Sequence, residues 1–291
     1  MKRLMIVLGM MLLLSSAASL LMGAAPVSPE AVMQALLGRG DPLVSTIVWE
    51  LRIPRLLLAW LVGGSLGLAG AAMQGLLRNP LVEPGLLGVS GGAALGAVVA
   101  FYSGVGVSLG LPLAGMGGAA LAVGLVMAVS ARWGSIQGMI LAGVAISAAC
   151  GALTSLFLNL SPNPYAAMEI LFWLLGSIAD RTMDHVFLAA PLVVLGSVLL
   201  LRGGRALQAL SLGEESAQSL GFSLRRVRAE VVLGTALAVG AAVSVSGAIS
   251  FVGLIVPHLL RPWVKGDPGR LLPCSMLGGA LLLLWADMLV R

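Results

Sequence analysis

A long uncharged run limits what this chain can fold into. Residues 84–131 contain no Asp, Glu, Lys or Arg, and a membrane-spanning helix needs only about 20 predominantly apolar residues. The run is therefore long enough for two spans. Uncharged apolar stretches also occupy residues 5–25 and 56–77. The sequence predicts an all-α polytopic membrane protein.

The composition agrees with a membrane protein and argues against other classes. The 291 residues are 59% hydrophobic and 10% charged, whereas a soluble domain carries about 25% charged residues. The net charge of +5 does not indicate a nucleic-acid partner, because the sequence has no basic patch interleaved with aromatic residues. Cys150 and Cys274 are isolated in apolar segments, so neither a disulfide nor a metal site is expected, and no cofactor is implied.

Nine membrane elements are expected, one of them short. The N-terminal segment starts with basic residues and continues into an apolar core, as signal peptides do, but its length favours an uncleaved first span. A short apolar piece at 251–260 is too brief to cross the membrane alone and is expected to end at Pro257 and His258, which predicts a broken or half helix. The eight full spans are predicted at about 5–25, 56–77, 85–103, 111–131, 136–160, 186–201, 231–249 and 271–290.

Basic residues predict the orientation of the spans. With the N-terminus inside, twelve of the seventeen Lys and Arg residues fall at inner ends, in accord with the positive-inside rule. Arg52 and Arg55, in the stretch WELRIPR, are then outside. Snorkelling to lipid headgroups is one explanation for such outer arginines. The five outer basic residues are Arg39, Arg52, Arg55, Arg181 and Arg291.

Two segments have similar sequences. VGGSLGLAGAAMQGL at 62–76 resembles VGAAVSVSGAISFVGL at 239–254, and in the predicted topology the two run in opposite directions. Opposed copies are typical of inverted-repeat transporters. Chance similarity within a chain rich in glycine and alanine is the alternative.

The longest polar stretch, at about 202–230, lies on the predicted inner side. Ser211 is expected to cap a short helix that carries Glu214 and Glu215 in its first turn and ends at Gly221. A second short helix from Ser223 would lead into the next span. Such a stretch is either a docking platform for another protein or an ordinary solvated loop.

Two proline pairs interrupt the chain between the second and third spans. Asn79-Pro80 and Glu83-Pro84 each disfavour helix, and the next helix begins in glycine-rich backbone near Gly88. Glu83 is expected to cap that next helix, because an anion is favoured at a helix N-terminus.

Other functional classes have weaker signals. Ser90 lies in a Gly-x-Ser-Gly sequence like that of intramembrane serine proteases, with His258 as a distant candidate base, but packing of small residues explains Ser90 as well. An ion-coupled secondary transporter would carry ionisable residues inside its spans. The span interiors here are nearly free of them, with Asp287, near the outer end of the last span, as the main exception, so a carrier of this kind is disfavoured. The chain has no phosphate-binding loop, so if ATP drives it, another chain binds the ATP.

Three long segments, in order, resemble the FecCD-type permeases, the membrane subunits of ABC importers for iron-siderophores, haem and cobalamin. The resemblance extends from about residue 45 to the C-terminus. Its segments are LRIPRLLLAWLVGGSLGLAGAAMQGLLRNPLVEPGLLGVSGGAALG, LSLGEESAQSLGFSLRRVR and GAISFVGLIVPHLLRPWVKGDPGRLLPCSMLGGALLLLWADMLVR.

The resemblance implies a type II ABC importer permease fold, with ten membrane helices per subunit and two subunits around one path. It implies a single transmembrane permease domain over 1–291 in a bacterial cytoplasmic membrane. This domain would be a transport subunit that carries out no bond chemistry of its own. The expected partners are an ABC ATPase, an extracytoplasmic binding protein and a second permease copy, as a homodimer. Family members continue past ADMLVR with a tenth helix, whereas this sequence stops at Arg291.

The resemblance also implies roles for particular residues. Contact with the ATPase is expected from Glu214, Glu215, Ala217 and Gly221. Contact with acidic residues of the binding protein is expected from Arg52, Arg55 and Arg291. Flexing backbone near the pathway is expected at Asn79, Pro80, Pro84, Gly88 and Pro257.

Overall fold

The computed structural model describes residues 2–23, 25–104, 109–133, 136–160 and 164–291, and its regular structure within these ranges is helical. Seven of the helices are long and apolar enough to cross a membrane. This confirms the predicted all-α polytopic class. The seven are α1 (Lys2–Leu21), α4 (Ile53–Leu77), α6 (Gly110–Trp133), α7 (Ile136–Asn159), α9 (Met183–Arg202), α12 (Leu224–Ser246) and α14 (Pro268–Val290).

Shorter helices complete the bundle. The predicted half helix is present as α13 (Val252–Leu260), and the predicted third span is the shorter α5 (Val89–Tyr102). Helix α8 (Pro164–Leu175) was not predicted, because its 12 residues are too few for a span and it contains Glu169. The remaining elements are α2 (Pro29–Leu36), α3 (Pro42–Thr46), the π-helix η1 (Ile47–Arg52), the 3-10 turns η2 (Pro84–Leu87) and η3 (Pro262–Val264), α10 (Gly204–Leu210) and α11 (Glu214–Ser219).

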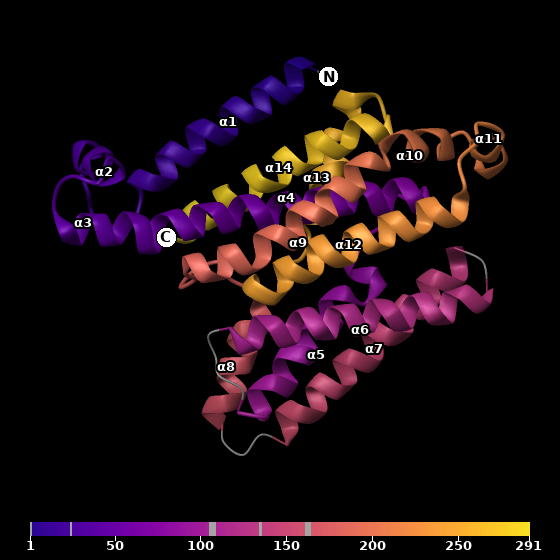
Figure 1. The fold of residues 1–291 in the computed structure, drawn as a ribbon, viewed down its shortest axis with the longest axis horizontal. Coiled ribbons are helices and arrows are strands. Elements are labelled where there is room, and N and C mark those ends of the chain that lie inside the picture. The colour runs from indigo at the N-terminus through magenta and orange to yellow at the C-terminus, as the bar shows by residue number, and fades with distance from the viewer. Residues whose placement is uncertain (1, 24, 105–108, 134–135, 161–163) are drawn as a thin grey trace.

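Helix α4 lies at the centre of the larger group of helices and packs against α14, α12, α13 and α9. Glycines allow this close approach: a Cβ atom on Gly63 would collide with the backbone of Gly279 in α14, and one on Gly70 with the backbone of Gly253 in α13. A second group contains α5, α6 and α7 (Figure 1), where Gly92 and Gly118 bring α5 and α6 together in the same way. Small residues at helix interfaces are typical of membrane proteins.

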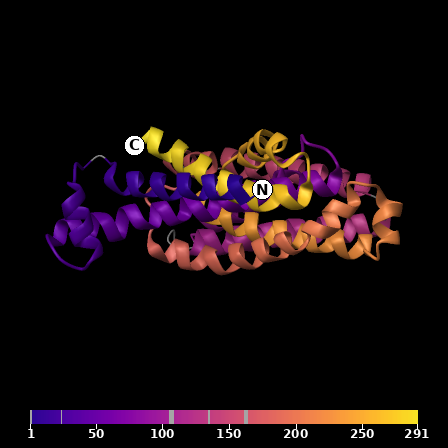
Figure 2. The same ribbon diagram turned by 90° about the horizontal axis from the view of Figure 1, so that it is seen from above.

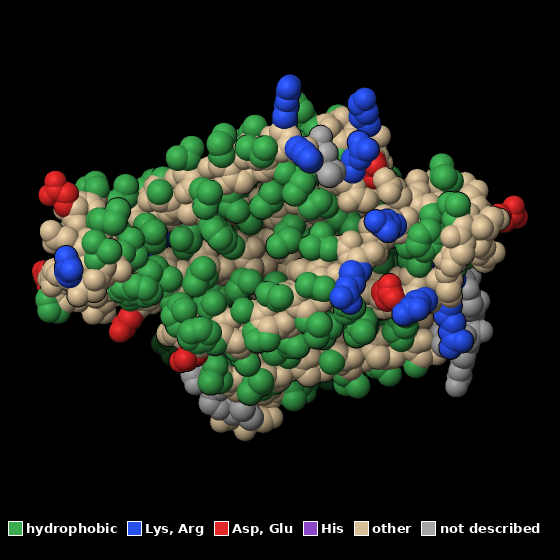
Figure 3. Space-filling model, turned by 45° about the horizontal axis from the view of Figure 1, so that its top comes forward, with side chains coloured by type: hydrophobic (Ala, Val, Ile, Leu, Met, Phe, Trp, Pro, Cys, Tyr) green, Lys and Arg blue, Asp and Glu red, His purple; other side chains and the backbone are tan. Residues whose placement is uncertain are grey.

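The two ends of the bundle differ. The N-terminus lies at the same end as α10 and α11, whereas α2, α3 and the C-terminus lie at the opposite end (Figure 1). The view from above shows the same elongated arrangement (Figure 2). Lys and Arg side chains gather toward the α10–α11 end, and hydrophobic side chains cover the surface between the ends (Figure 3). Such an apolar middle zone is what a hydrocarbon environment requires.

The two segments with similar sequences have different local structures. Helices α4 and α12 run in opposite directions (Figure 1), as the inverted-repeat interpretation requires. However, α4 is continuous through 62–76, whereas the second segment leaves α12 at Ser246. Gly247 (φ 71°) and Phe251 (φ 68°) then turn the chain before α13 begins.

Candidate functional site

The polar stretch at one end of the bundle folds into α10 and α11. Helix α11 begins at Glu214, and its N-cap is Gly213 (φ 115°) and not Ser211, whose Oγ donates to the carbonyl of Gln208 at 2.7 Å. The expected Ser211 cap is therefore wrong, because that hydroxyl already bonds within the preceding turn. The expected ending is confirmed. Gly221 (φ 86°) follows the helix, and Phe222 N donates to Ala217 O at 3.0 Å, as in a Schellman motif.

The two acidic residues of α11 have different surroundings. Glu214 Oε1 accepts from Arg228 Nη2 of α12 at 3.1 Å, which ties the short helix to the span that follows. Glu215 is exposed and Ala217 is buried. Two large apolar side chains flank the helix and are exposed, Leu212 at 71% and Leu220 at 62%. Here the chain presents an apolar and acidic surface on a fixed helix.

The interrupted segment at 79–88 and the half helix α13 contact each other in the structure. After α4, Asn79 Oδ1 accepts from Leu81 N at 3.0 Å, and Pro84 starts the 3-10 turn that ends at Gly88 (φ 75°). Pro84 packs against Gly253 of α13, where an added Cβ atom would lie 2.7 Å from Pro84 Cδ. The segment after α4 and the half helix α13 therefore form one packed unit.

Glu83 caps a different helix from the one expected. Its Oε1 accepts from Phe251 N at 2.9 Å, at the start of α13, and it makes no side-chain cap with η2. The intervening turn explains the difference, because α5 begins only at Val89. The carboxylate lies instead at the N-terminus of α13, where an anion is favoured.

Pro257 does not end α13, as the sequence had suggested, since the helix continues to Leu260. Its missing N–H instead leaves the carbonyl of Gly253 without the usual helical partner. The side-chain amide of the buried residue Gln74 reaches that carbonyl, with Nε2 at 3.5 Å from Gly253 O and 3.4 Å from Leu254 O.

Gln74 also joins other parts of this unit. Its Nε2 lies 3.3 Å from Val82 O, and its Oε1 accepts from Arg261 Nη2 at 2.6 Å. One side chain in α4 thus contacts the segment after α4 and both ends of α13. Sequence reasoning missed Gln74, although it is the only side-chain amide in the uncharged run 56–77.

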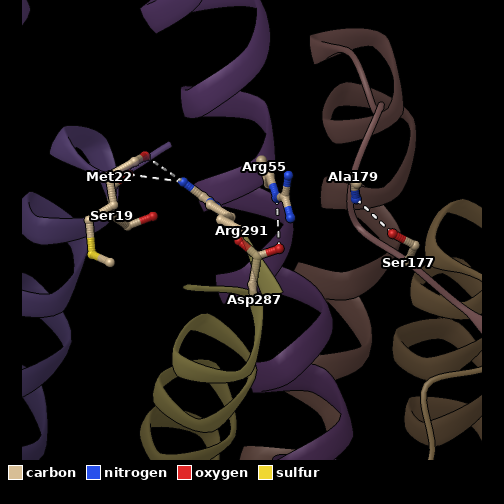
Figure 4. Close-up of polar contacts among 7 residues, drawn as sticks. All are labelled: Ser19, Met22, Arg55, Ser177, Ala179, Asp287 and Arg291. Carbon is tan, nitrogen blue, oxygen red and sulfur yellow. Dashed lines mark hydrogen bonds and ion pairs between the residues drawn. The ribbon is translucent and has the colours of Figure 1, made fainter. Parts of the chain in front are cut away.

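At the opposite end, a carboxylate lies between two of the expected docking arginines (Figure 4). Asp287 Oδ1 accepts from Arg55 Nε at 2.7 Å, and Asp287 Oδ2 accepts from Arg291 Nη2 at 2.6 Å. The Asp287 side chain is 4% exposed and that of Arg55 is 24% exposed. Of the three side chains in this ionic group, that of Arg55 is the most exposed to solvent.

The other arginine contacts hold the end of α1. Arg52 is buried and donates to Leu20 O at 2.6 Å and Ala25 O at 2.7 Å. Arg291 Nη1 donates to Ser19 O at 3.0 Å. The last carbonyls of a helix lack intrahelical partners and favour a nearby cation. Two guanidiniums thus cap the C-terminal end of α1.

Four of the five guanidiniums at this end face a common space. A cavity of about 490 Å³, here called the outer cavity, is lined by basic, acidic and small residues. Arg181, in the segment between α8 and α9, is the member that sequence reasoning did not single out. The sequence feature that could have identified Arg181 is that it is one of the five basic residues at predicted outer ends. The charged residues that line the outer cavity are Arg52, Arg55, Arg181, Arg291, Glu50 and Asp180.

The geometry gives no support to catalysis by Ser90. Ser90 lies in the first turn of α5 and His258 is exposed in α13, and within the described ranges no hydrogen bond joins them. A nucleophile needs its base within hydrogen-bond reach. The described residues also contain no cluster of three or more potential metal ligands.

Comparison with known proteins gives consistent matches. A model of the FecCD transport family matches residues 11–291. The chain is 39% identical to the hemin transport system permease protein of Yersinia pestis, over 84% of this chain and 75% of that protein. It is 38% identical to the ferric enterobactin transport system permease protein of Escherichia coli, over 97% of this chain and 85% of that protein.

A solved structure has the same fold. It is described as an inward-facing conformation of a metal-chelate type ABC transporter, and it matches with a TM-score of 0.90 and 32% sequence identity. The match covers 100% of this chain and 91% of that chain.

Proposed function

Because this chain belongs to the FecCD transport family, we propose that it is the membrane-spanning permease subunit of an importer whose ATP is bound by a separate ABC ATPase. The proposed solute is a metal chelate: an iron-siderophore, haem or cobalamin. The relatives described above, which are permease proteins of hemin and ferric enterobactin transport systems, support this class. The proposed location of the protein is the cytoplasmic membrane of a bacterium, with its N-terminus on the cytoplasmic side.

The observation that carries this proposal is the surface on α11. Leu212 and Leu220 are exposed beside Glu215, and the salt bridge from Glu214 to Arg228 fixes the helix to α12. Exposed apolar side chains with a polar rim are typical of protein interfaces. We assign this surface, with Ala217 and Gly221 shaping the helix, to the ATPase.

Charge introduction at this surface tests the ATPase contact. Leu212→Glu and Leu220→Glu are expected to abolish co-purification of the ATPase subunit, because a carboxylate would replace each apolar contact. Leu43→Glu is the matched control, since Leu43 is also exposed but lies in α3 at the other end. Undiminished ATPase in both α11 variants would contradict the assignment.

The outer end is the proposed docking surface for the binding protein, through Arg52, Arg55 and Arg291. Arg55 is the most exposed of the three at its side chain, so it would make first contact with acidic residues. Arg55→Gln is expected to slow association with the binding protein by about tenfold and to weaken its salt dependence. Arg39→Gln, exposed at the same end, is the control. Equal association rates for both variants would exclude a docking role for Arg55.

Helix α12 offers a physical route between the two ends. Near its start Arg228 binds Glu214 of α11, and at its last residue Ser246 O accepts from Ser177 N at 2.6 Å. We propose that ATP-driven movement of α11 is passed through α12 to the outer end, in an alternating-access cycle. The unit of α13 and 79–88 would flex in that cycle. A second copy of the chain would complete the path.

An ion-coupled carrier is the second candidate, and Asp287 was its main support. That carboxylate is bonded to Arg55 and Arg291, so it has a structural role without ion transport. Import that continues without the ATPase and stops when the proton gradient collapses would favour the carrier.

A further inference from the structure

Arg181 differs from the three other guanidiniums of the outer cavity. Arg52, Arg55 and Arg291 each have hydrogen-bond acceptors at 2.6–3.0 Å inside the protein. The Nε atom of Arg181 is buried and has no hydrogen-bond partner among the residues described. Buried donors are nearly always paired, so this guanidinium has capacity for an acceptor from outside the chain.

A second cavity adjoins Arg181. This aromatic cavity, of about 240 Å³, lies between α5, α6 and α8 and is lined by Phe101, Phe172 and Trp173 together with Arg181 and Asp180. Arg181 therefore lines both the charged outer cavity and the aromatic one. Aromatic and apolar walls with a few placed polar groups are typical of small-molecule sites.

The backbone holds Arg181 in place. Asp180 has a left-handed conformation (φ 55°), as does Gly176 (φ 77°). Ala179 N donates to Ser177 Oγ at 3.0 Å (Figure 4), and Ser177 N donates to Ser246 O at the end of α12. The segment that carries Arg181 is thus attached to the helix that leads to α11. A group bound at Arg181 would therefore lie on a segment that is hydrogen-bonded to α12, the helix proposed to link the two ends.

The charges favour an anion. Four guanidiniums and two carboxylates line the outer cavity, so the guanidiniums outnumber the carboxylates there. Burial lowers the pKa of Arg181, while the nearby Asp180 raises it. Even so, arginine stays protonated in proteins. Its planar guanidinium matches a carboxylate through two parallel hydrogen bonds.

We propose that Arg181 binds a carboxylate of the transported solute and that the aromatic cavity holds the apolar or ring-shaped body next to that carboxylate. The proposal rests on the import function proposed above and narrows its solute class to amphiphilic anions. A carboxylate from the docking protein is the other possible source, but it would bring no ring to fill the aromatic cavity.

The test uses the permease assembled with its ATPase in nanodiscs, without the binding protein. The probes are 2-naphthoate, a carboxylate on an aromatic body, and the neutral 2-naphthamide, measured by equilibrium dialysis. Naphthoate is expected to bind more tightly than naphthamide, and Arg181→Gln is expected to weaken naphthoate binding at least about tenfold. Arg39→Gln, exposed outside both cavities, is the matched control and should leave binding unchanged.

Several results would overturn the proposal. One is equal naphthoate affinity in Arg181→Gln and the unchanged chain, and another is equal affinity for the two probes. A third is weaker association of Arg181→Gln with the binding protein while naphthoate binding is unchanged, which would assign Arg181 to docking.

Assembly and binding are separable in this design. Retained ATPase shows that Arg181→Gln is folded. If that variant does not assemble, Arg181→Lys keeps the charge without the paired donors, and Phe101→Leu alters only the aromatic wall. Both should bind naphthoate several-fold more weakly, and unchanged affinity in both would refute the site. Failure of the proposed import function would appear separately, as undiminished co-purification of the ATPase with the Leu212→Glu and Leu220→Glu variants.

Discussion

At the residue scale, the outer arginines have two kinds of partner. Arg52 and Arg291 donate to carbonyls at the end of α1, whereas Arg55 and Arg291 share the carboxylate of Asp287. These contacts join α1, α4 and α14 at one point. Snorkelling to lipid headgroups is therefore not needed to explain why arginines lie here, because each of the three has internal partners.

Removing the shared carboxylate tests this joint. Asp287→Asn keeps the size of the side chain but leaves two guanidiniums without their anion. Losing one partner of a buried ion pair costs about 3–5 kcal/mol, and the partial exposure of Arg55 places the expected loss near the lower end. The measurement is the midpoint of thermal unfolding in detergent.

Glu50→Gln provides the comparison, because Glu50 is exposed at the same end and has no ion pair among the described residues. It should change stability by less than about 0.5 kcal/mol. Equal unfolding midpoints for the two variants would show that the Asp287 bridge contributes little.

Sequence patterns identified the arginines but not their partners. WELRIPR placed Arg52 and Arg55 at the mouth of a span, yet Asp287 lies 232 positions from Arg55. From the sequence, Asp287 is the main ionisable residue within the predicted spans. Arg291 lies only four positions from Asp287, but the packing of α4 against α14 is what brings Arg55 to the same carboxylate.

At the element scale, two irregular segments stabilise each other. The proline in α13 leaves Gly253 O without a helical donor, and Gln74 of α4 approaches that carbonyl. The carboxylate of Glu83 accepts a hydrogen bond from the backbone N–H of Phe251, at the start of α13. The 3.6-residue periodicity locates the helices, but it carries no information about which break contacts which.

A double-mutant cycle measures the link between Gln74 and Pro257. Gln74→Leu should cost about 1–3 kcal/mol of unfolding free energy, because buried polar groups lose their partner. Pro257→Ala supplies the missing N–H to Gly253 O. In that background Gln74→Leu should cost about 1 kcal/mol less. Denaturant unfolding of the four proteins gives the coupling, and strictly additive effects would show that the two residues act independently.

At the scale of the whole molecule, one helix links the two proposed working ends. Helices α4 and α12 are the most buried of the candidate spans, and α12 contacts α11 at one end and the Arg181 segment at the other. The less buried α1 lies on one side of them, and α6 and α7 lie on the other (Figure 1). In the proposed transport cycle, the central helix α12 would move against these outer helices.

Labelling of single cysteines tests the orientation of the molecule in the membrane. In a background in which the buried Cys150 and Cys274 are replaced by alanine, an impermeant maleimide added outside should label Leu43→Cys. It should not label Arg3→Cys or Leu212→Cys, because the N-terminus and α11 share the opposite end. Permeabilised cells should show all three labelled. The reverse pattern would invert the topology and, with it, the assignment of both docking surfaces.

The sequence by itself determined the class, most of the spans, the half helix and the polar stretch that forms α11. Uncharged runs, proline pairs and helix-ending glycines are local signals, and the membrane makes them strong because backbone groups must be satisfied within each helix. The tertiary structure decided which carboxylate Arg55 and Arg291 share, which helix Glu83 caps and what Gln74 contacts. It also placed Arg181 between two cavities. These features depend on contacts between residues far apart in the chain, where close glycine packing sets the distances and no local pattern records them.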